Sequence, residues 1–583
     1  MKNAQARLWL CIAISLVAAC TRGKSKEPAE KSSSVQVAVP PGEQTKPASA
    51  AVDDDWLAGR LPASVREGTP VAGGELTVGI DTEPPSLNVS VDSDLVASWI
   101  TLHRVSNCLL DLDVRHPPDY KYTPELAERW EISEDKKTYT FHLRKGVRWH
   151  DGQPFTARDV IATFDKVQDP TSKAAHVRAL LAELASYAAP DDFTFVMKWK
   201  RAYAFTLDAL TGIPIQPAHV IGKLTGRQYN EAATNPINRK PIGTGPFKFV
   251  SWESNSKIVL ERNPDYWGEK TLLDRLVFRI TSDDTVRMQL AERGEIDVLL
   301  GVKSDQWRNM DSPVLRKDWN RSRFVPNQYG WIGWNETRPM FADKRARLAM
   351  TMLIDRPGIV NKLMYGLPSQ TECHFYVATN QCDPAIKPPP FDPEGAMKLL
   401  DEVGWKDSDG DGVRDKGGQP FSFVFMLPSG AEEASRWAAK IKEDMARAGV
   451  AMEIQKVEWS AFTKRLVEHN FDACTLLWGS SGPYDDPTQI WHSSSVNGGS
   501  NYISFKNAEA DKLIEQARVE FDLAARDALY RKLGAILHDE QPYTFLYIRP
   551  MLELLHKRVK GAVPSLAWWN FETMWIDPAL RRK

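Results

Sequence analysis

The chain has 583 residues, 42% of them hydrophobic, and this length exceeds what one hydrophobic core holds, so two to four packed units are expected. Its 74 basic and 76 acidic residues leave a formal net charge of −2, and no long basic block occurs. Because phosphate neutralisation needs a clustered positive surface, this charge distribution argues against nucleic acid as a partner.

The amino terminus has the pattern of a secretory signal. Two basic residues precede the apolar run Leu8–Ala19, which is too short to cross a bilayer core of about 30 Å. The run ends in Val17-Ala-Ala-Cys20, which resembles a bacterial lipobox. We therefore expect residues 1–19 to be a signal peptide and Cys20 to carry a lipid that anchors the protein to a membrane. An ordinary signal peptide with an unrelated cysteine is the alternative.

The segment after Cys20 is rich in Lys, Glu, Ser, Pro and Ala. Such a composition cannot bury enough apolar surface to offset the entropy of ordering, so residues 20–70 are predicted to be a disordered tether. The folded part is expected to begin with a strand at 75–80, after which strands and helices alternate. A further strand is predicted at 139–143.

Two helices have clear start signals. Thr156-Ala-Arg-Asp159 forms a capping box, in which the first and fourth residues bond each other's backbone. A second helix follows Asp392 as N-cap and Pro393 as its first residue, and Gly404 marks its end.

The cysteines after the signal peptide fall into two groups. Cys373 and Cys382 bracket a short loop, and outside the cytoplasm such a pair favours a local disulfide. A Cys/His metal site that includes His374 is the rarer alternative. Cys108 and Cys474 lie in apolar sequence and are expected to be buried free thiols.

An acidic stretch partly matches a calcium-binding loop. Asp407, Asp409 and Asp411 take the first three ligand positions, with Asp415 at the ninth. The twelfth position is Gly418 rather than a bidentate Glu, and no helix is predicted to follow. A loop of Asx turns without a metal explains the same residues, so we expect no cofactor, with calcium as the minor alternative.

The region 421–478 is predicted to be β-α-β-α-β, which implies a largely parallel sheet with helices on both faces. Ligands of such sheets bind just beyond the carboxyl ends of the strands. The Gly/Pro-rich loop 479–487 follows the third strand and is therefore the candidate binding site, although an ordinary polar loop would have the same composition. The candidate residues are Trp478, Gly479, Ser480, Tyr484, Asp485 and Asp486.

Motifs for catalysis are missing from the sequence. It contains no Gly-x-Ser-x-Gly elbow, no His-Glu-x-x-His pair and no phosphate-binding Gly-x-x-x-x-Gly-Lys-Ser/Thr loop. The 11 His are scattered and give no metal-ligand spacing. The protein is therefore predicted to bind rather than to catalyse.

Taken as a whole, residues 74–576 resemble solute-binding protein family 5, the dipeptide, oligopeptide and nickel receptors of ABC importers. The resemblance is carried by Thr123–Ile132, Tyr139–Val160, Gly243–Phe247, Arg262–Trp267, Gly294–Asp297 and Phe341–Met350.

This resemblance implies an α/β fold like that of periplasmic binding proteins, a two-lobed clamp with an additional inserted subdomain. It implies a lobe I core of 71–107, 236–327 and 542–583, an inserted subdomain of 108–235 and a lobe II of 328–541. The segment 327–334 would be one crossing strand, exposing Tyr329 and Trp331 near the cleft.

The resemblance also implies a function. The protein would be a monomeric periplasmic lipoprotein that captures peptides or peptide-like solutes and delivers them to ABC permease subunits. Peptide-binding relatives commonly carry an aspartate four residues before the proline of Asp-Pro, where this chain has Pro483. Asp485 or Asp486 could replace it, or the ligand lacks a free amino terminus. The alternatives are a sensor or chaperone-like lipoprotein and a receptor for nickel or a metallophore complex.

Overall fold

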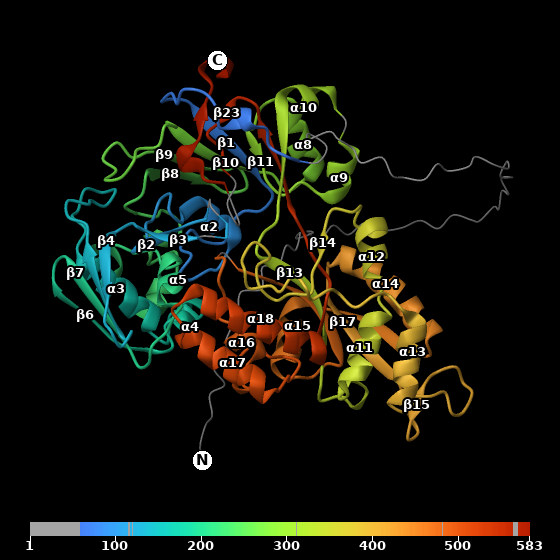
Figure 1. Ribbon diagram of the computed structural model, residues 1–583. Coiled ribbons are helices and arrows are strands. Elements are labelled where there is room, and N and C mark those ends of the chain that lie inside the picture. Colours follow the sequence, from blue (N-terminus) through green and yellow to red (C-terminus); the bar gives the residue numbers. More distant parts are fainter. Residues whose placement is uncertain are drawn as a thin grey trace.

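The computed structural model describes residues 59–114, 117–118, 120–310, 312–480, 482–563 and 569–582. The predicted signal peptide and Cys20 lie outside the described residues. The chain folds as a mixed α/β protein built around a seven-stranded, a five-stranded and a four-stranded sheet (Figure 1). Within the described residues no helix is long and apolar enough to cross a membrane.

The seven-stranded sheet has the strand order β12-β22-β11-β1-β10-β9-β8. The predicted first strand is β1 (Glu75–Ile80), which pairs in parallel with β10 and β11. Its Leu76, Val78 and Ile80 are buried in the core of this part. The other strands are β8 (Phe247–Glu253), β9 (Lys257–Arg262), β10 (Arg275–Ile280), β11 (Val298–Leu299), β12 (Trp319–Phe324) and β22 (Met551–His556). The helices beside them are α2 (Leu95–Thr101), α8 (Asp284–Glu292), α9 (Ser304–Asn309) and α10 (Pro313–Asp318).

Packed structure begins earlier than the predicted end of the tether at residue 70. Val65 is buried in the same core as β1, and the Gly59 carbonyl accepts a hydrogen bond of 2.9 Å from the Arg323 amide. The apolar Leu61 and Val65 interrupt the polar composition and supply the surface that packs. The tether prediction is therefore wrong for residues 59–65.

The four-stranded antiparallel sheet lies at one side of the molecule (Figure 1). Its helix α3 (Ala157–Gln168) begins at Thr156 as predicted, and the Thr156 amide donates to the Asp159 carboxylate at 2.8 Å. The strands are β4 (Ala127–Ile132), β5 (Thr138–Leu143), β6 (Leu184–Asp191) and β7 (Thr194–Trp199). Near them lie the hairpin β2 (Leu110–Asp113) and β3 (Lys121–Pro124) and the helices α4 (Ala175–Leu180), α5 (Thr206–Thr211), α6 (Ala218–Ile221) and α7 (Gly226–Asn230).

The five-stranded sheet has the order β18-β17-β19-β13-β20. The predicted β-α-β-α-β unit is confirmed, with β17 parallel to both β18 and β19. The sheet is nevertheless mixed, because β13 pairs antiparallel with β19 and β20. The elements of the unit are β17 (Ser422–Pro428), α14 (Glu432–Arg447), β18 (Ala451–Val457), α15 (Trp459–Val467) and β19 (Ala473–Gly479), and the added strands are β13 (Gln328–Trp334) and β20 (Tyr543–Phe545).

Helices cover both faces of this sheet. On one face, Trp334 and Phe423 belong to a core shared with α11 (Lys344–Met352), α13 (Pro393–Glu402) and α14. On the other face, Trp331 and Trp478 belong to a core shared with α15, α16 (Thr488–Trp491), α17 (Ala508–Val519) and α18 (Leu523–Glu540). The start of α13 is as predicted, because the Asp392 carboxylate accepts from the Gly395 amide at 2.9 Å.

The chain passes between the seven-stranded and five-stranded sheets twice. Residues 325–327 join β12 to β13, and residues 549–550 join β21 (Tyr547–Ile548) to β22. The Gln328 side chain donates to the Arg549 carbonyl at 2.8 Å, so the two segments touch. Residues 543–545 form a strand of the five-stranded sheet, next to β13. The resemblance had instead placed residues 542–583 in the lobe I core, so that boundary differs for β20.

The cysteines and the acidic loop follow the local expectations. Cys373 and Cys382 form a disulfide, and Cys108 and Cys474 are buried free thiols. In the exposed acidic loop, the Asp409 carboxylate accepts from the Asp411 amide at 3.3 Å, and the Asp411 carboxylate accepts from the Val413 amide at 2.8 Å. These Asx-turn bonds are the interactions expected of a turn-rich loop.

Leu400 and Leu399 provide a direct test of how α13 packs against the five-stranded sheet. Leu400 is fully buried, whereas Leu399 is partly exposed. We expect Leu400→Ala to lower the free energy of unfolding by about 2–5 kcal/mol, because it leaves a cavity in the core. Leu399→Ala should cost clearly less. Guanidinium unfolding followed by tryptophan fluorescence measures both, and equal losses would contradict the packing of α13.

Candidate functional site

The candidate loop 479–487 lies against the first segment that joins the two large sheets. The Ser480 amide donates to the Asn327 carbonyl at 2.9 Å. The Asn327 side-chain amide in turn donates to the Gly482 carbonyl at 2.8 Å and to the Asp485 carboxylate at 3.0 Å. One side chain of the crossing segment therefore fixes both the backbone and the acidic group of the loop.

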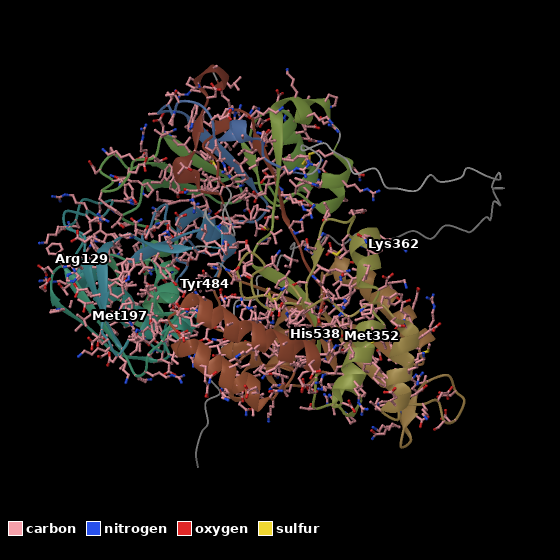
Figure 2. The ribbon with its side chains drawn as sticks, in the orientation of Figure 1. Arg129, Met197, Met352, Lys362, Tyr484 and His538 are labelled. Carbon is pink, nitrogen blue, oxygen red and sulfur yellow. A yellow bond between two sulfur atoms is a disulfide. The ribbon has the colours of Figure 1, made fainter. Side chains whose placement is uncertain are left out.

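The other side of the loop meets residues that precede and follow the four-stranded sheet. Tyr484 lies where the four-stranded sheet region meets the helices of the five-stranded sheet region (Figure 2). Its ring packs edge-on against Tyr120, with ring centroids 5.9 Å apart. The Tyr203 hydroxyl donates to the Asp486 carboxylate at 3.1 Å. Next to it, the Ala204 amide donates to the Arg518 carbonyl at 2.8 Å. The loop is thus enclosed between the five-stranded and four-stranded sheet regions.

The negative charge of Asp486 is balanced by a neighbouring arginine, Arg518. Its carboxylate pairs with the Arg518 guanidinium at 2.9 Å and also accepts from the Thr488 amide at 3.0 Å. Arg518 lies over the Tyr203 ring at 5.3 Å from its centroid. These contacts hold Asp486 as a structural anion between α17 and Tyr203.

Asp485 has a different environment. Burial raises the pKa of its carboxyl group, while hydrogen bonds from Ser480 and Asn327 lower it and the charge of Asp486 raises it further. In the described part of the chain, no Lys, Arg or His forms an ion pair with Asp485. The loop therefore has one partly exposed acid without a cationic partner among the described residues.

Further polar groups come from elements that the sequence did not single out. Burial raises the pKa of Asp208 in α5 to about 6, against the opposing charge of Arg526. The Asp208 Oδ2, the Arg526 Nε and the Tyr530 hydroxyl are all buried without a hydrogen-bond partner among the described residues. Arg526 lies over the Tyr484 ring at 5.5 Å from its centroid. No local sequence motif marks these residues, because Asp208 lies in α5 and Arg526 and Tyr530 lie in α18, and only the folded chain brings these helices together.

Tyr329 and Trp331 were expected to be exposed near the cleft, and this expectation is wrong. Trp331 has no exposed surface, and its ring stacks between those of Tyr543 and Trp478, with centroid distances of 4.1 Å and 5.6 Å. Tyr329 is 4% exposed and hydrogen-bonds the His374 ring at 2.5 Å. The physical reason is that β13 is an inner strand of a sheet covered on both faces, so neither set of alternating side chains reaches solvent.

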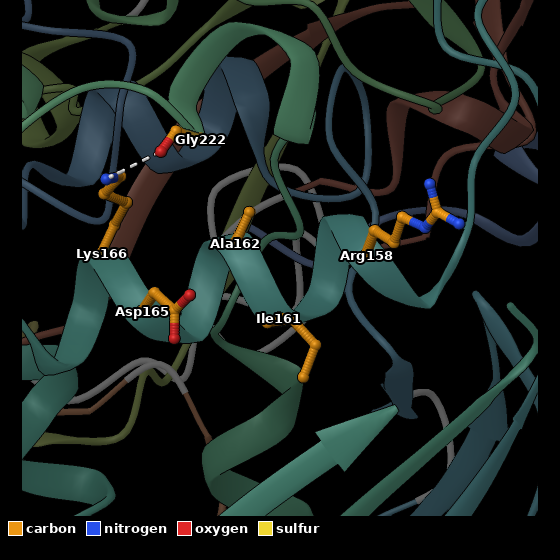
Figure 3. A pocket seen from close by; sticks show the side chains of 6 residues that line it. All are labelled: Arg158, Ile161, Ala162, Asp165, Lys166 and Gly222. Carbon is orange, nitrogen blue, oxygen red and sulfur yellow. Dashed lines mark hydrogen bonds between the residues drawn. The ribbon is translucent and has the colours of Figure 1, made fainter. Parts of the chain in front are cut away.

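Two small cavities lie elsewhere. One of about 190 Å³ lies beside α3 and is lined by Arg158, Ile161, Ala162, Asp165, Lys166 and Gly222 (Figure 3). Another of about 160 Å³ lies beside β17 and β18 and includes Arg338, Gln455 and Arg465. No residue of the 479–487 loop lines either cavity.

Comparison with known proteins identifies the family. Residues 121–501 match the model of the bacterial extracellular solute-binding proteins, family 5 Middle. The oligopeptide-binding protein AppA of Bacillus subtilis (strain 168) is 29% identical over 520 residues, which cover 87% of this chain and 93% of AppA. The dipeptide-binding protein of Escherichia coli (strain K12) is 29% identical over 489 residues, which cover 78% of this chain and 86% of that protein.

A solved structure agrees with the sequence comparison. The structure of AppA from Bacillus subtilis in complex with a nonapeptide superposes with a TM-score of 0.72 at 28% identity, covering 87% of this chain and all of that one. Because the family consists of solute-binding proteins, the prediction of a receptor rather than an enzyme is confirmed. The chain belongs to the bacterial extracellular solute-binding proteins of family 5.

Proposed function

We propose that this protein is the receptor of an ABC importer and that it binds peptides or peptide-like solutes at the 479–487 loop. The observation that carries the proposal is the partly exposed carboxyl group of Asp485, which has a hydrogen bond from Asn327 but no cationic partner among the described residues. A ligand ammonium group supplies the missing charge, and charge-assisted hydrogen bonds in a desolvated site are strong.

The relatives support this ligand class. AppA was crystallised with a nonapeptide, and the name of the E. coli relative describes a dipeptide-binding protein. At the position where peptide-binding relatives commonly have the aspartate, this chain has the buried Pro483. Asp485, two residues later, takes that role in our proposal, whereas Asp486 is already paired with Arg518. The most direct test is gentle denaturation of the purified protein followed by mass spectrometry of any released ligand.

Binding is coupled to closure in this proposal. The seven-stranded sheet belongs to one lobe, the five-stranded sheet to the other, and the crossing segments 325–327 and 549–550 form the hinge. The inserted subdomain, 108–235, reaches across to the second lobe through the bonds of Tyr203 and Ala204. A ligand that contacts both sides stabilises the closed arrangement and shifts the population toward it.

We further propose that the receptor is held at the cell envelope by a lipid on Cys20. The lipobox-like sequence ending at Cys20 and the extracellular assignment of the family support this placement. The polar stretch after Cys20 provides a tether between the membrane and the packed part that begins by residue 59. Capture then takes place outside the cytoplasm, where the monomeric receptor meets the permease subunits.

Asp485→Asn tests the role of the loop. It should lower affinity for peptides with a free amino terminus by about 10–100-fold, since a hydrogen bond to a charged group contributes about 1.5–3 kcal/mol. Isothermal titration calorimetry against free and amino-terminally acetylated forms of one peptide measures the effect. The neighbouring Asp486→Asn is the matched control and should retain the preference for the free amino terminus. An unchanged preference in Asp485→Asn would overturn the assignment.

Tyr203→Phe tests the contact that bridges the two sides. Removing the hydroxyl that donates to Asp486 should weaken ligand affinity about 2–10-fold, because one hydrogen bond of the closed state contributes about 0.5–1.5 kcal/mol. Tyr187→Phe is the control, because its hydroxyl makes a similar bond to Asp165 within the inserted subdomain. Solution scattering with and without peptide reports closure, and equal affinities in the two variants would argue against the bridge.

A further inference from the structure

Three metal-ligating side chains lie together away from the 479–487 loop. They are His103, Cys108 and Glu125, whose potential ligand atoms all lie within 4.8 Å of one another. His103 follows α2, Cys108 precedes β2, and Glu125 lies between β3 and β4. The cluster thus joins the chain leaving the seven-stranded sheet region to the first strands of the four-stranded sheet region.

The three groups are held by their surroundings. Glu125 is fixed by the Cys108 amide, which donates to one carboxylate oxygen at 2.6 Å, and by the Asn107 side chain, which donates to the other. His103 has a φ of 62°. A non-glycine residue persists in this left-handed region only when its surroundings determine its conformation.

The imidazole of His103 has two carboxylate neighbours. Its Nδ1 lies 3.1 Å from a Glu125 oxygen, and its Nε2 lies 3.3 Å from an Asp111 oxygen. In metal sites, a ligating histidine almost always gives its other ring nitrogen to a carboxylate, a carbonyl or water, which fixes the ring. Asp111 occupies that orienting position, and a bound ion would take the place of the Glu125 hydrogen bond at Nδ1.

The donor set selects the kind of ion. A nitrogen, a sulfur and an oxygen donor within one small buried site suit a borderline-soft divalent ion such as zinc, while calcium and magnesium prefer oxygen ligands alone. We propose that His103, Cys108 and Glu125 form a zinc-class metal site, with Asp111 as a positioning residue. Binding converts the Cys108 thiol to a thiolate and releases its proton to solvent. The site is independent of the peptide-binding proposal.

Cobalt(II) alone is a suitable probe, because a thiolate ligand gives it a near-ultraviolet charge-transfer band. We expect the chelator-treated full-length protein to bind one equivalent of Co²⁺ with this band, and Zn²⁺ to displace it. Cys108→Ser should abolish the band. The matched control is Cys474→Ser, which removes the other buried free thiol and should leave the band unchanged.

Asp111→Asn provides a second variant at a half-exposed position, where misfolding is less of a concern. It should retain the band but lower Co²⁺ affinity by about 10–100-fold, as the loss of an orienting partner does in other metal sites. Circular dichroism checks the fold of each variant. The proposal is overturned if the wild-type protein shows no thiolate band, if Cys108→Ser retains it, or if Asp111→Asn binds Co²⁺ as tightly as the wild type.

Discussion

The candidate site depends on how the charges of two adjacent, largely covered carboxylates, Asp485 and Asp486, are compensated. Burial makes an uncompensated charge costly, so each acid needs a cation, several hydrogen bonds or a proton. Asp486 takes the cation, because Arg518 lies 2.9 Å away. Asp485 receives the Asn327 side chain and keeps a raised pKa. Asp486 thus holds the loop in place, and Asp485 is the acid that we propose to contact the ligand.

Asn327 links this chemistry to the mechanics of the protein. It lies on the segment that joins β12 to β13, and it also binds the Gly482 carbonyl of the loop. A rotation of the two large sheets about this segment would therefore move the loop with the five-stranded sheet. Gln328, the next residue, bonds the second crossing segment at the Arg549 carbonyl. The candidate loop 479–487 and the proposed hinge are thus connected through Asn327 and Gln328.

The sequence predicted local features well and long-range contacts poorly. The β-α-β-α-β unit and the helix caps follow from periodicity and capping chemistry, which involve neighbouring residues. The loop at the end of β19 followed from the same reasoning. Tyr203 and Asp208 could not be predicted in this way, because their partners lie far along the chain. The exposure of Trp331 was mispredicted because its burial depends on α15, α16, α17 and α18, which lie far along the chain.

The contacts between the inserted subdomain and the five-stranded sheet region must still allow the two lobes to separate. Tyr203 and Ala204 each contribute one hydrogen bond across this boundary, of about 0.5–1.5 kcal/mol net, and an apolar core that includes Tyr203 and Trp478 spans both sides. Because a ligand shifts an equilibrium only by its differential affinity for the two states, ligand contacts to both sides have to add to these ligand-independent contacts. Asp485 has no cationic partner among the described residues. In the proposed mechanism, a ligand cation that pairs with Asp485 in the closed state would couple recognition to closure.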